Sequence, residues 1–266
     1  MKKFFVILCF IGLFFDKVQA QGETTITMPR LRLGIEAGAN VLFGDADNHE
    51  RIRSYHDYGI FFDFFPRIEN DFSFFYLGVK PEYVLHKRFT IAAGVRFSLS
   101  TLSLGSDRKY FLWKVREEGT NTDYLKIQKI SQKKYYIGIP LEVKFFPRVK
   151  DYFVRHYFIV GAVFNFLVAS DNDVSFQDAA MKKYASDVSS QIGNPNFHGQ
   201  LFGGIGLKIG RTNRPFGNIE LRLPIYMLTN DKSNSLMKES GALGFGLQLT
   251  LQIPVFPKHQ LVYKIN

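Results

Sequence analysis

The sequence predicts an all-β fold, an eight-stranded antiparallel up-and-down β-barrel that crosses a membrane and carries long extracellular loops. The first observation is the alternation of residues 243–255, in which Leu247, Leu249 and Leu251 are separated by Gln248 and Thr250. Successive side chains of a strand point to opposite faces, so this segment has one apolar and one polar face. Its 13 residues exceed the roughly 9–11 that a tilted strand needs to cross a bilayer.

Composition agrees with this prediction. After Ala20 no run of 18 apolar residues occurs, which excludes helical spans from the sequence. Yet 46% of the chain is hydrophobic and 16% is aromatic, with 28 Phe and 13 Tyr. Apolar residues dispersed at period two are what a barrel facing lipid requires.

The first 20 residues have the pattern of a secretory signal peptide. Lys2 and Lys3 precede the apolar stretch 4–15, and Val18-Gln19-Ala20 forms a small-residue cleavage site. A membrane-anchoring helix is the alternative, but 12 apolar residues are too few to span. Cys9 lies within the signal, so we expect a mature chain from residue 21 without cysteine. Residues 21–30 and 257–266 are expected as periplasmic segments on either side of a barrel domain at 31–256.

Eight spanning strands fit the alternation, and their connections fall into two classes. Short connections at 85–88, 147–155 and 211–215 alternate with long ones at 44–72, 102–134, 170–197 and 230–242. Such barrels have tight periplasmic turns and extended outer loops. The aromatic segment 58–65 leaves a ten-stranded alternative open, and 109–115 with 124–130 are expected to form the upper part of a long hairpin. The predicted strands are 31–43, 73–84, 89–101, 135–146, 156–169, 198–210, 216–229 and 243–255.

The apolar parity of each strand predicts which side chains face lipid. In the fourth strand these are the odd residues 137–145, and in the seventh they are Ile219, Leu221, Leu223, Ile225 and Met227. The fifth strand is apolar on both parities, so its orientation stays open. Aromatic residues near strand ends are expected at the membrane interfaces: Phe43, Tyr135, Phe145, Tyr157, Tyr226 and Phe256.

The opposite parity carries ten charged residues, which we expect to point into the lumen. Placing Arg or Lys on the lipid side at mid-depth would cost about 2–4 kcal/mol. An eight-stranded barrel is just wide enough for side chains to fill it, so the charges should pair and close the interior. A proton or ion path is the alternative to this structural network, but buried charges need partners in any narrow lumen. The residues are Arg32, Glu36, Lys80, Glu82, Arg96, Glu142, Lys144, Lys208, Glu220 and Arg222.

No motif indicates catalysis, a cofactor or a metal. His49 and His56 share the first outer loop with Asp45, Asp47 and Asp57 but lack ligand spacing. No nucleophile-elbow motif surrounds the serines of 186–190 that could pair with His198. The glycines of 203–206 lie within an alternating strand and precede no helix, so they do not form a phosphate loop. The sequence therefore favours a non-enzymatic protein.

One segment carries a family resemblance. The run Tyr135-Tyr136-Ile137-Gly138-Ile139-Pro140-Leu141-Glu142-Val143-Lys144-Phe145-Phe146 resembles the fourth strand of the small outer-membrane β-barrel domain family, the porin-like or PorT-like group, and Glu220-Leu221-Arg222 also fits it. The resemblance implies an eight-stranded barrel in the outer membrane of a Gram-negative envelope, with no shared catalytic residue. One member group acts in protein secretion across that membrane. The last strand, ending at Phe256, resembles a signal for the outer-membrane assembly machinery, although ten residues follow it.

We therefore expect a monomeric barrel whose outer loops mediate binding. The net charge of +10 over the full chain favours anionic outer-membrane lipid and lipopolysaccharide over nucleic acid as the partner of exposed Lys and Arg. The alternatives are a subunit of an envelope secretion or assembly apparatus, which predicts a stable protein partner, a lipid-modifying or proteolytic enzyme, and a diffusion pore. The candidate contact surface consists of Tyr110, Phe111, Trp113, Lys114 and Arg116.

Overall fold

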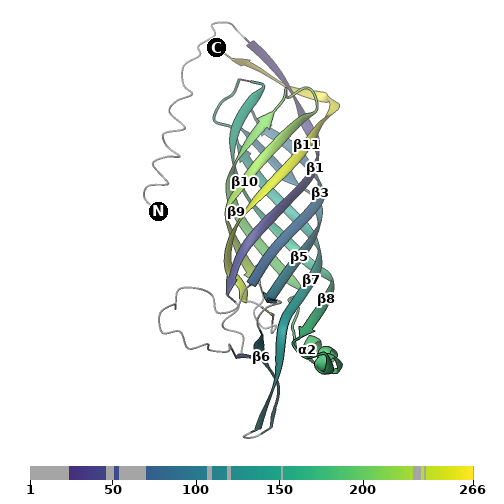
Figure 1. Ribbon diagram of the computed structural model, residues 1–266. Helices are drawn as coiled ribbons and strands as arrows, with labels where there is room; N and C mark the ends of the chain where they lie inside the picture. The colour runs from purple at the N-terminus through teal and green to yellow at the C-terminus, as the bar shows by residue number, and fades with distance from the viewer. Residues whose placement is uncertain are drawn as a thin grey trace, which may run out of the picture.

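The computed structural model describes residues 24–45, 51–53, 70–106, 110–118, 121–150, 152–229, 235–236 and 238–265. These residues form eleven strands, one 3-10 helix and one short α-helix (Figure 1). The elements are β1 (Thr24–Asp45), β2 (Ile52–Arg53), β3 (Asn70–His86), β4 (Phe89–Ala93), β5 (Val95–Gly105), β6 (Phe111–Glu118), β7 (Asn121–Phe145), β8 (Val154–Phe176), η1 (Ala179–Tyr184), α2 (Ala185–Ser190), β9 (Phe197–Ile209), β10 (Phe216–Thr229) and β11 (Lys238–Ile265).

The strands form one antiparallel sheet that closes on itself. The pairings run from β1 through β3, β4 with β5, β7, β8, β9, β10 and β11, and β11 pairs with β1 again. Figure 1 shows the result as a cylinder of steeply tilted strands. Each strand of this circuit therefore finds partners for its backbone groups on both sides.

The predicted count of eight strands is wrong, because the sheet has eleven. β4 and β5 both pair with β3 and β7 and occupy one position of the circuit. The break between them falls at Gly94, where a Cβ atom would lie 2.2 Å from the carbonyl oxygen of Val79. β2 and β6 lie beyond the circuit, where β6 pairs with the first part of β7. The closed circuit itself has eight positions.

The strands extend further than the sequence predicts. Residues 24–29 of β1 pair with residues 260–265 of β11, although both segments were expected to flank the barrel. The expected hairpin is confirmed, because Phe111 of β6 pairs with Ile127 of β7. Helices η1 and α2 fold within the predicted loop 170–197. The signal segment 1–20 and the aromatic segment 58–65 lie outside the described residues.

The cylinder has two different ends. The connections β3–β4, β7–β8 and β9–β10 lie at one end, together with the last residues of β11 (Figure 1). We call this the short-turn end. The β6–β7 hairpin and α2 lie at the other, which we call the loop end. In the part of the chain that the structure describes, no helix has the length and apolar character needed to span a membrane.

The strand faces follow the predicted parity in most of the sheet. Ile137, Ile139, Leu141 and Val143 of β7 are 41–48% exposed on the outer wall, whereas Tyr136, Glu142 and Lys144 are buried inside. The orientation of β8, open from the sequence, is now defined. Phe158, Val160 and Phe164 face outward, and Arg155, Tyr157, Ile159 and Val163 face inward. The expectation that Tyr157 lies at an interface is therefore wrong.

β10 contains the one departure from parity that moves predicted lipid-facing residues inside. Arg222 pairs with Gly246 and Ile225 with Gly244, so β10 has one extra residue at Leu223-Pro224. Such a β-bulge reverses the alternation that follows it. Ile225 and Met227 are consequently 1% and 0% exposed, and the prediction that they face lipid is wrong. Tyr226 and Leu228 take the outward positions.

Candidate functional site: the interior of the closed sheet

The interior contains a connected group of charged side chains, which we call the inner ion-pair network. It comprises four glutamates from β1, β3, β7 and β10, and five cations from β1, β3, β5, β7 and β10. None is more than 3% exposed. The members are Arg32, Glu36, Lys80, Glu82, Arg96, Glu142, Lys144, Glu220 and Arg222.

The ion pairs form one continuous path across the lumen. At the short-turn side, Glu82 accepts from Arg32 at 2.9 Å and contacts Lys144 at 3.0 Å. Lys144 also contacts Glu220 at 3.0 Å, and Arg222 joins Glu220 at 3.0 Å to Glu142 at 2.7 Å.

The path continues from Glu142 to Glu36 through two cations. Lys80 contacts Glu142 and lies 2.7 Å from Glu36. Arg96 lies 2.9 Å from Glu36 and 3.6 Å from Glu142. Every glutamate of the network therefore contacts at least two cations, which offsets the desolvation of the buried charges.

The register makes room for these long side chains by placing glycines beside them. Arg96 pairs across the sheet with Gly78 on one side and Gly138 on the other. Arg222 likewise lies between Gly204 and Gly246. A Cβ atom at Gly78 would lie 2.8 Å from Cβ of Arg96, and one at Gly138 would lie 3.0 Å from its Cγ, so glycine at these two positions leaves room for the stem of the arginine.

Neutral polar residues that were not among the predicted lumen residues extend the network. The Tyr157 hydroxyl donates to Glu220 at 2.8 Å, and Gln248 Nε2 donates to the same carboxylate at 3.0 Å. The Tyr76 hydroxyl donates to Gln248 Oε1 at 3.1 Å, and the Arg96 guanidinium lies 4.2 Å from the Tyr76 ring centroid. Tyr76 and Gln248 share the inward parity of Lys80 and Thr250, and that signal could have identified them.

Lys208, the tenth predicted lumen residue, lies apart from the nine. Its ammonium group donates to the Thr212 hydroxyl and lies 4.8 Å from the Phe216 ring centroid. Arg32 lies 5.2 Å from the same ring, and Arg155 lies 4.6 Å from the ring of Phe146. Cations over aromatic rings therefore line the short-turn end of the lumen.

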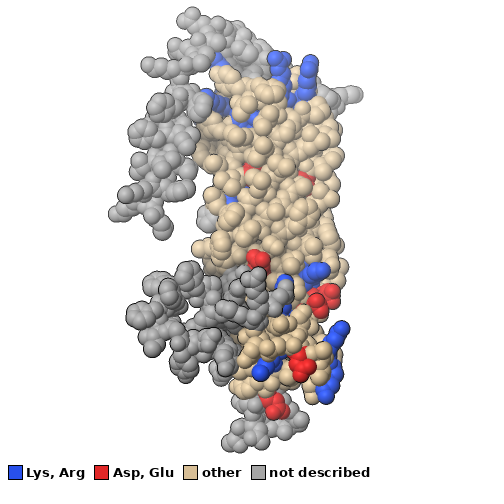
Figure 2. All heavy atoms as spheres, viewed as in Figure 1, with Lys and Arg blue, Asp and Glu red and all other residues tan. Residues whose placement is uncertain are grey.

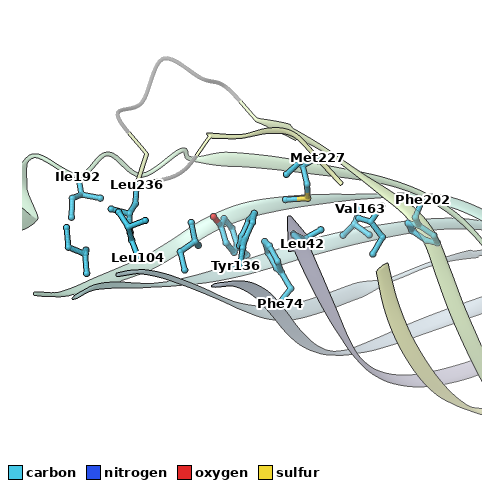
Figure 3. Close-up of a cluster of buried hydrophobic side chains, with 14 of the residues drawn as sticks. Leu42, Phe74, Leu104, Tyr136, Val163, Ile192, Phe202, Met227 and Leu236 are labelled. Atoms are coloured by element: carbon cyan, nitrogen blue, oxygen red, sulfur yellow. The ribbon is translucent and has the colours of Figure 1, made fainter. Parts of the chain in front are cut away.

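The loop end of the lumen is filled by apolar residues instead (Figure 3). They come from the inward positions of five circuit strands, from β6, from the α2 region and from the segment between β10 and β11, and each is at most 4% exposed. We call this group the loop-end cluster. Its residues are Leu42, Phe72, Phe74, Leu102, Leu104, Phe111, Trp113, Ile127, Ile130, Tyr136, Val188, Ile192, Ile225, Met227 and Leu236.

The predicted contact surface is wrong for its two largest apolar members. Trp113 is 0% and Phe111 is 3% exposed, because the β6–β7 hairpin turns both side chains into the loop-end cluster. Tyr110 and Lys114 are half-buried. The side chain of Arg116 lies outside the described residues.

Gln191 connects three of the long loops above the cluster. Its Oε1 accepts from Trp113 Nε1 at 3.0 Å and from Arg51 Nη1 at 3.3 Å. Its Nε2 donates to the carbonyl of Val115 at 3.1 Å. The first, second and third loops are thereby joined through a single side chain just after α2.

His198 lies between the two parts of the interior. Its ring stacks on Phe74 with centroids 4.9 Å apart and an angle of 7°, and Nδ1 lies 3.3 Å from Asn165 Nδ2. Its Nε2 lies 3.1 Å from the Met227 sulfur. Aromatic packing and these two polar contacts account for its position within the core.

The residues considered for chemistry do not assemble into a site within the described chain. No group of three or more His, Cys, Asp or Glu that could hold a metal occurs there. His49, His56, Asp47 and Asp57 lie outside the described residues. The glycines 203–206 lie in the middle of β9, which supports their assignment to a strand.

A cavity of about 840 Å³ is formed by the wall of the cylinder. Its lining includes Tyr83, Ile91, Val143, Val160 and Leu201, all at outward positions on successive strands. The lining also includes Ala92, Glu142 and Phe202, which are buried at inward positions, so it combines residues of both faces of the sheet.

Comparison with known proteins gives no family assignment. No family model matches the chain, and no curated protein matches it. Among solved structures, the outer membrane protein OprG from Pseudomonas aeruginosa is similar with a TM-score of 0.43 and 12% identity, over 86% of this chain and 98% of that one. The N-terminal β-barrel domain of Pseudomonas aeruginosa OprF has a TM-score of 0.32 and 11% identity, over 84% and 97%. The translocator domain of the autotransporter NalP from Neisseria meningitidis has a TM-score of 0.31 and 8% identity, over 85% and 88%. At these TM-scores the likenesses carry no argument about this chain.

Proposed function

We propose that the protein is a non-enzymatic β-barrel of the outer membrane, with a closed interior and with outer loops that mediate binding. The observation that carries this proposal is the reversed distribution of side chains between wall and lumen. Apolar side chains cover the outside of the closed sheet, while nine charged residues are buried in ion pairs inside it. A protein folded in water would expose the charges and bury the apolar residues.

The outer wall has the extent that a bilayer requires. The outward residues of β11 from Leu243 to Val255 are 38–52% exposed and uniformly apolar. Thirteen residues at about 3.3 Å each, tilted by about 40°, rise roughly 30 Å, which matches a hydrocarbon core. Figure 2 shows few Lys, Arg, Asp or Glu side chains over the middle of the visible face, and more of them toward its two ends.

Two features of the interior support a closed barrel and not a pore. The inner ion-pair network starts at Arg32 on β1, reaches Glu220 on β10 and returns to Glu36 on β1, and the loop-end cluster fills the part of the lumen beyond it. In a cylinder with eight strand positions, side chains of this size occupy the cross-section. The network therefore serves to hold the barrel together.

The remaining parts of the proposal rest on the sequence. Residues 1–20 would direct export, the termini would lie in the periplasm, and the last strand would be recognised by the assembly machinery. A PorT-like role in secretion rests only on the resemblance of residues 135–146. With Trp113 and Phe111 buried, binding falls to exposed loop-end residues such as Tyr124 and Tyr184, which are 38% and 37% exposed.

The test uses the full chain in detergent and in bilayers. An intact barrel is expected to migrate differently in unboiled and boiled samples and to give a β-rich circular dichroism spectrum. Planar bilayers containing the protein should show no large, steady conductance. Identical migration of both samples would overturn the barrel, and stable openings would overturn the closed interior.

A further inference from the structure

The three short turns form a strongly basic surface. They carry six cations at exposed or half-buried positions, and no Asp or Glu of these turns falls within the described residues. Asp151, which is not described, would reduce the net charge of the three turns only to +5. We call this surface the basic rim, and it consists of Lys87, Arg88, Arg148, Lys150, Arg211 and Arg214.

The rim is one surface, because the turns are hydrogen-bonded to each other. The amide of Phe146 donates to the carbonyl of Arg88 at 2.8 Å, which joins the first turn to the second. The amide of Gly210 donates to the carbonyl of Phe153 at 2.7 Å, which joins the second to the third. Lys87, Arg88, Arg211 and Arg214 have no carboxylate partner among the described residues. The charge of these four side chains is thus held on a fixed scaffold, and no described carboxylate cancels it.

The loop end differs, since its charges are mixed. Among the described residues there, the exposed or half-buried side chains include six aspartates and seven cations, for a net charge of +1. The aspartates are Asp71, Asp123, Asp171, Asp173, Asp178 and Asp187, and the cations are Arg51, Lys114, Lys126, Lys129, Lys133, Lys182 and Lys183. The excess of positive charge is therefore specific to the short-turn end. In Figure 2, blue groups gather near the end opposite the mixed red and blue ones.

Exposed apolar residues lie directly beside the basic rim. Leu85 and Phe89 flank the first turn and are 53% and 42% exposed, and Tyr152 and Phe153 in the second turn are 40% and 64% exposed. Aromatic rings beside cations are the arrangement found at the boundary between hydrocarbon and headgroups. Clusters of four to eight Lys or Arg at such a boundary bind anionic lipid headgroups.

From this geometry we propose that the basic rim binds anionic phospholipid headgroups of the membrane leaflet at the short-turn end. The proposal rests on the proposed function, because it requires the apolar wall to lie in a bilayer. It adds the lipid class and the leaflet. The rim cations contact the phosphates while Phe89, Tyr152 and Phe153 lie among the first acyl carbons.

The experiment measures lipid retention by the full chain. Wild type is solubilised with equal amounts of phosphatidylglycerol and phosphatidylcholine, and native mass spectrometry counts the lipids retained. We expect phosphatidylglycerol to be enriched at least about fivefold, which is the contribution of one cation near an anionic surface. High salt should remove the enrichment, because exposed charges are screened.

Two fourfold variants with the same charge change separate the two ends. The rim variant K87Q/R88Q/R211Q/R214Q should lower the enrichment to within about twofold of unity. The loop-end variant K126Q/K133Q/K182Q/K183Q should keep the wild-type value. Should the rim variant not fold, the pairs K87Q/R88Q and R211Q/R214Q replace it, each with a partial loss expected.

The outcomes distinguish this inference from the proposed function. Unboiled and boiled samples are compared for wild type and for every variant, and a wild-type chain that forms no barrel contradicts the proposed function itself. A folded rim variant that retains phosphatidylglycerol like wild type overturns the inference alone. A loop-end variant that loses as much phosphatidylglycerol as the rim variant also overturns the inference. The same holds for a rim variant that still retains phosphatidylglycerol but no longer retains lipopolysaccharide or an acidic protein.

Discussion

The two parts of the lumen are built from the same strands but from opposite kinds of side chain. β3 contributes Lys80 and Glu82 to the inner ion-pair network and, a few residues away at the same parity, Phe72 and Phe74 to the loop-end cluster. β10 does the same, with Glu220 and Arg222 on one side of its bulge and Ile225 and Met227 on the other. An inward-facing position can therefore carry either a charged or an apolar side chain.

This difference shows what each part contributes to the closed sheet. Ion pairs have short, directional contacts, so the network is compatible with one register of β1, β3, β5, β7 and β10. Apolar contacts have no preferred direction and fill the space beneath the loops. We infer that the network specifies how the strands align, whereas the cluster attaches the long loops to the cylinder.

The largest effect is expected from removing a carboxylate of the network. In Glu142→Ala, Lys80, Arg96 and Arg222 lose a shared partner, and the lumen retains an uncompensated positive charge. Breaking a buried pair in this way should reduce the free energy of unfolding by about 3–5 kcal/mol. Urea unfolding of the full chain in detergent measures it.

The matched control changes an acid at the loop end. Asp71 is exposed, so Asp71→Ala should change the free energy of unfolding by no more than about 0.5 kcal/mol. If Glu142→Ala reduced the free energy of unfolding as little as this control, water would have to replace the carboxylate. That result would contradict the inference that the network specifies how the strands align.

A smaller effect is expected where the bulge in β10 places an apolar residue inside. Ile225→Ala should leave a cavity and reduce the free energy of unfolding by about 2–5 kcal/mol. Leu221 is 39% exposed on the outer wall, and Leu221→Ala should cost below about 1 kcal/mol because lipid or detergent fills the space. Equal costs at the two positions would contradict the inward orientation of Ile225.

Much of this fold follows from period-two alternation. The orientation of residues 31–43, 135–146 and 243–255 could be predicted because only one parity of each is apolar. The ten inward charges were identified for the same reason, and all are at most 3% exposed. Energetically, alternation is a strong signal here because a charge on the apolar wall has no polar partner.

The signal failed where both parities are apolar or where one residue breaks the count. β8 has Ile159 and Val163 inside and Phe158 and Val160 outside, so the two parities of its sequence do not differ in polarity. The bulge at Leu223-Pro224 leaves the alternation of apolar residues in the sequence intact, but it reverses which parity faces the lumen after it. Trp113 was placed on a surface because loops are usually exposed, but the hairpin and Gln191 bring it into the core.

The smallest effect concerns the close packing that lets large polar side chains fit within the lumen. A Cβ atom at Gly206 would lie 2.3 Å from Cζ of Tyr157, whose hydroxyl donates to Glu220 at 2.8 Å. Gly206→Ala must therefore displace the Tyr157 ring and should reduce the free energy of unfolding by about 1–3 kcal/mol. At Gly217 a Cβ atom would meet nothing within 4 Å. Gly217→Ala should then be neutral or stabilising by up to about 1 kcal/mol.

A double-mutant cycle sharpens this comparison, because Gly206 and Tyr157 should be coupled while Gly217 and Tyr157 should not. In a Tyr157→Ala background the ring is absent, so most of the cost of Gly206→Ala should disappear, whereas Gly217→Ala should have the same effect as in wild type. Persistence of the full cost without the ring would mean that Gly206 is needed for its backbone and not for the space that Tyr157 occupies beside the network.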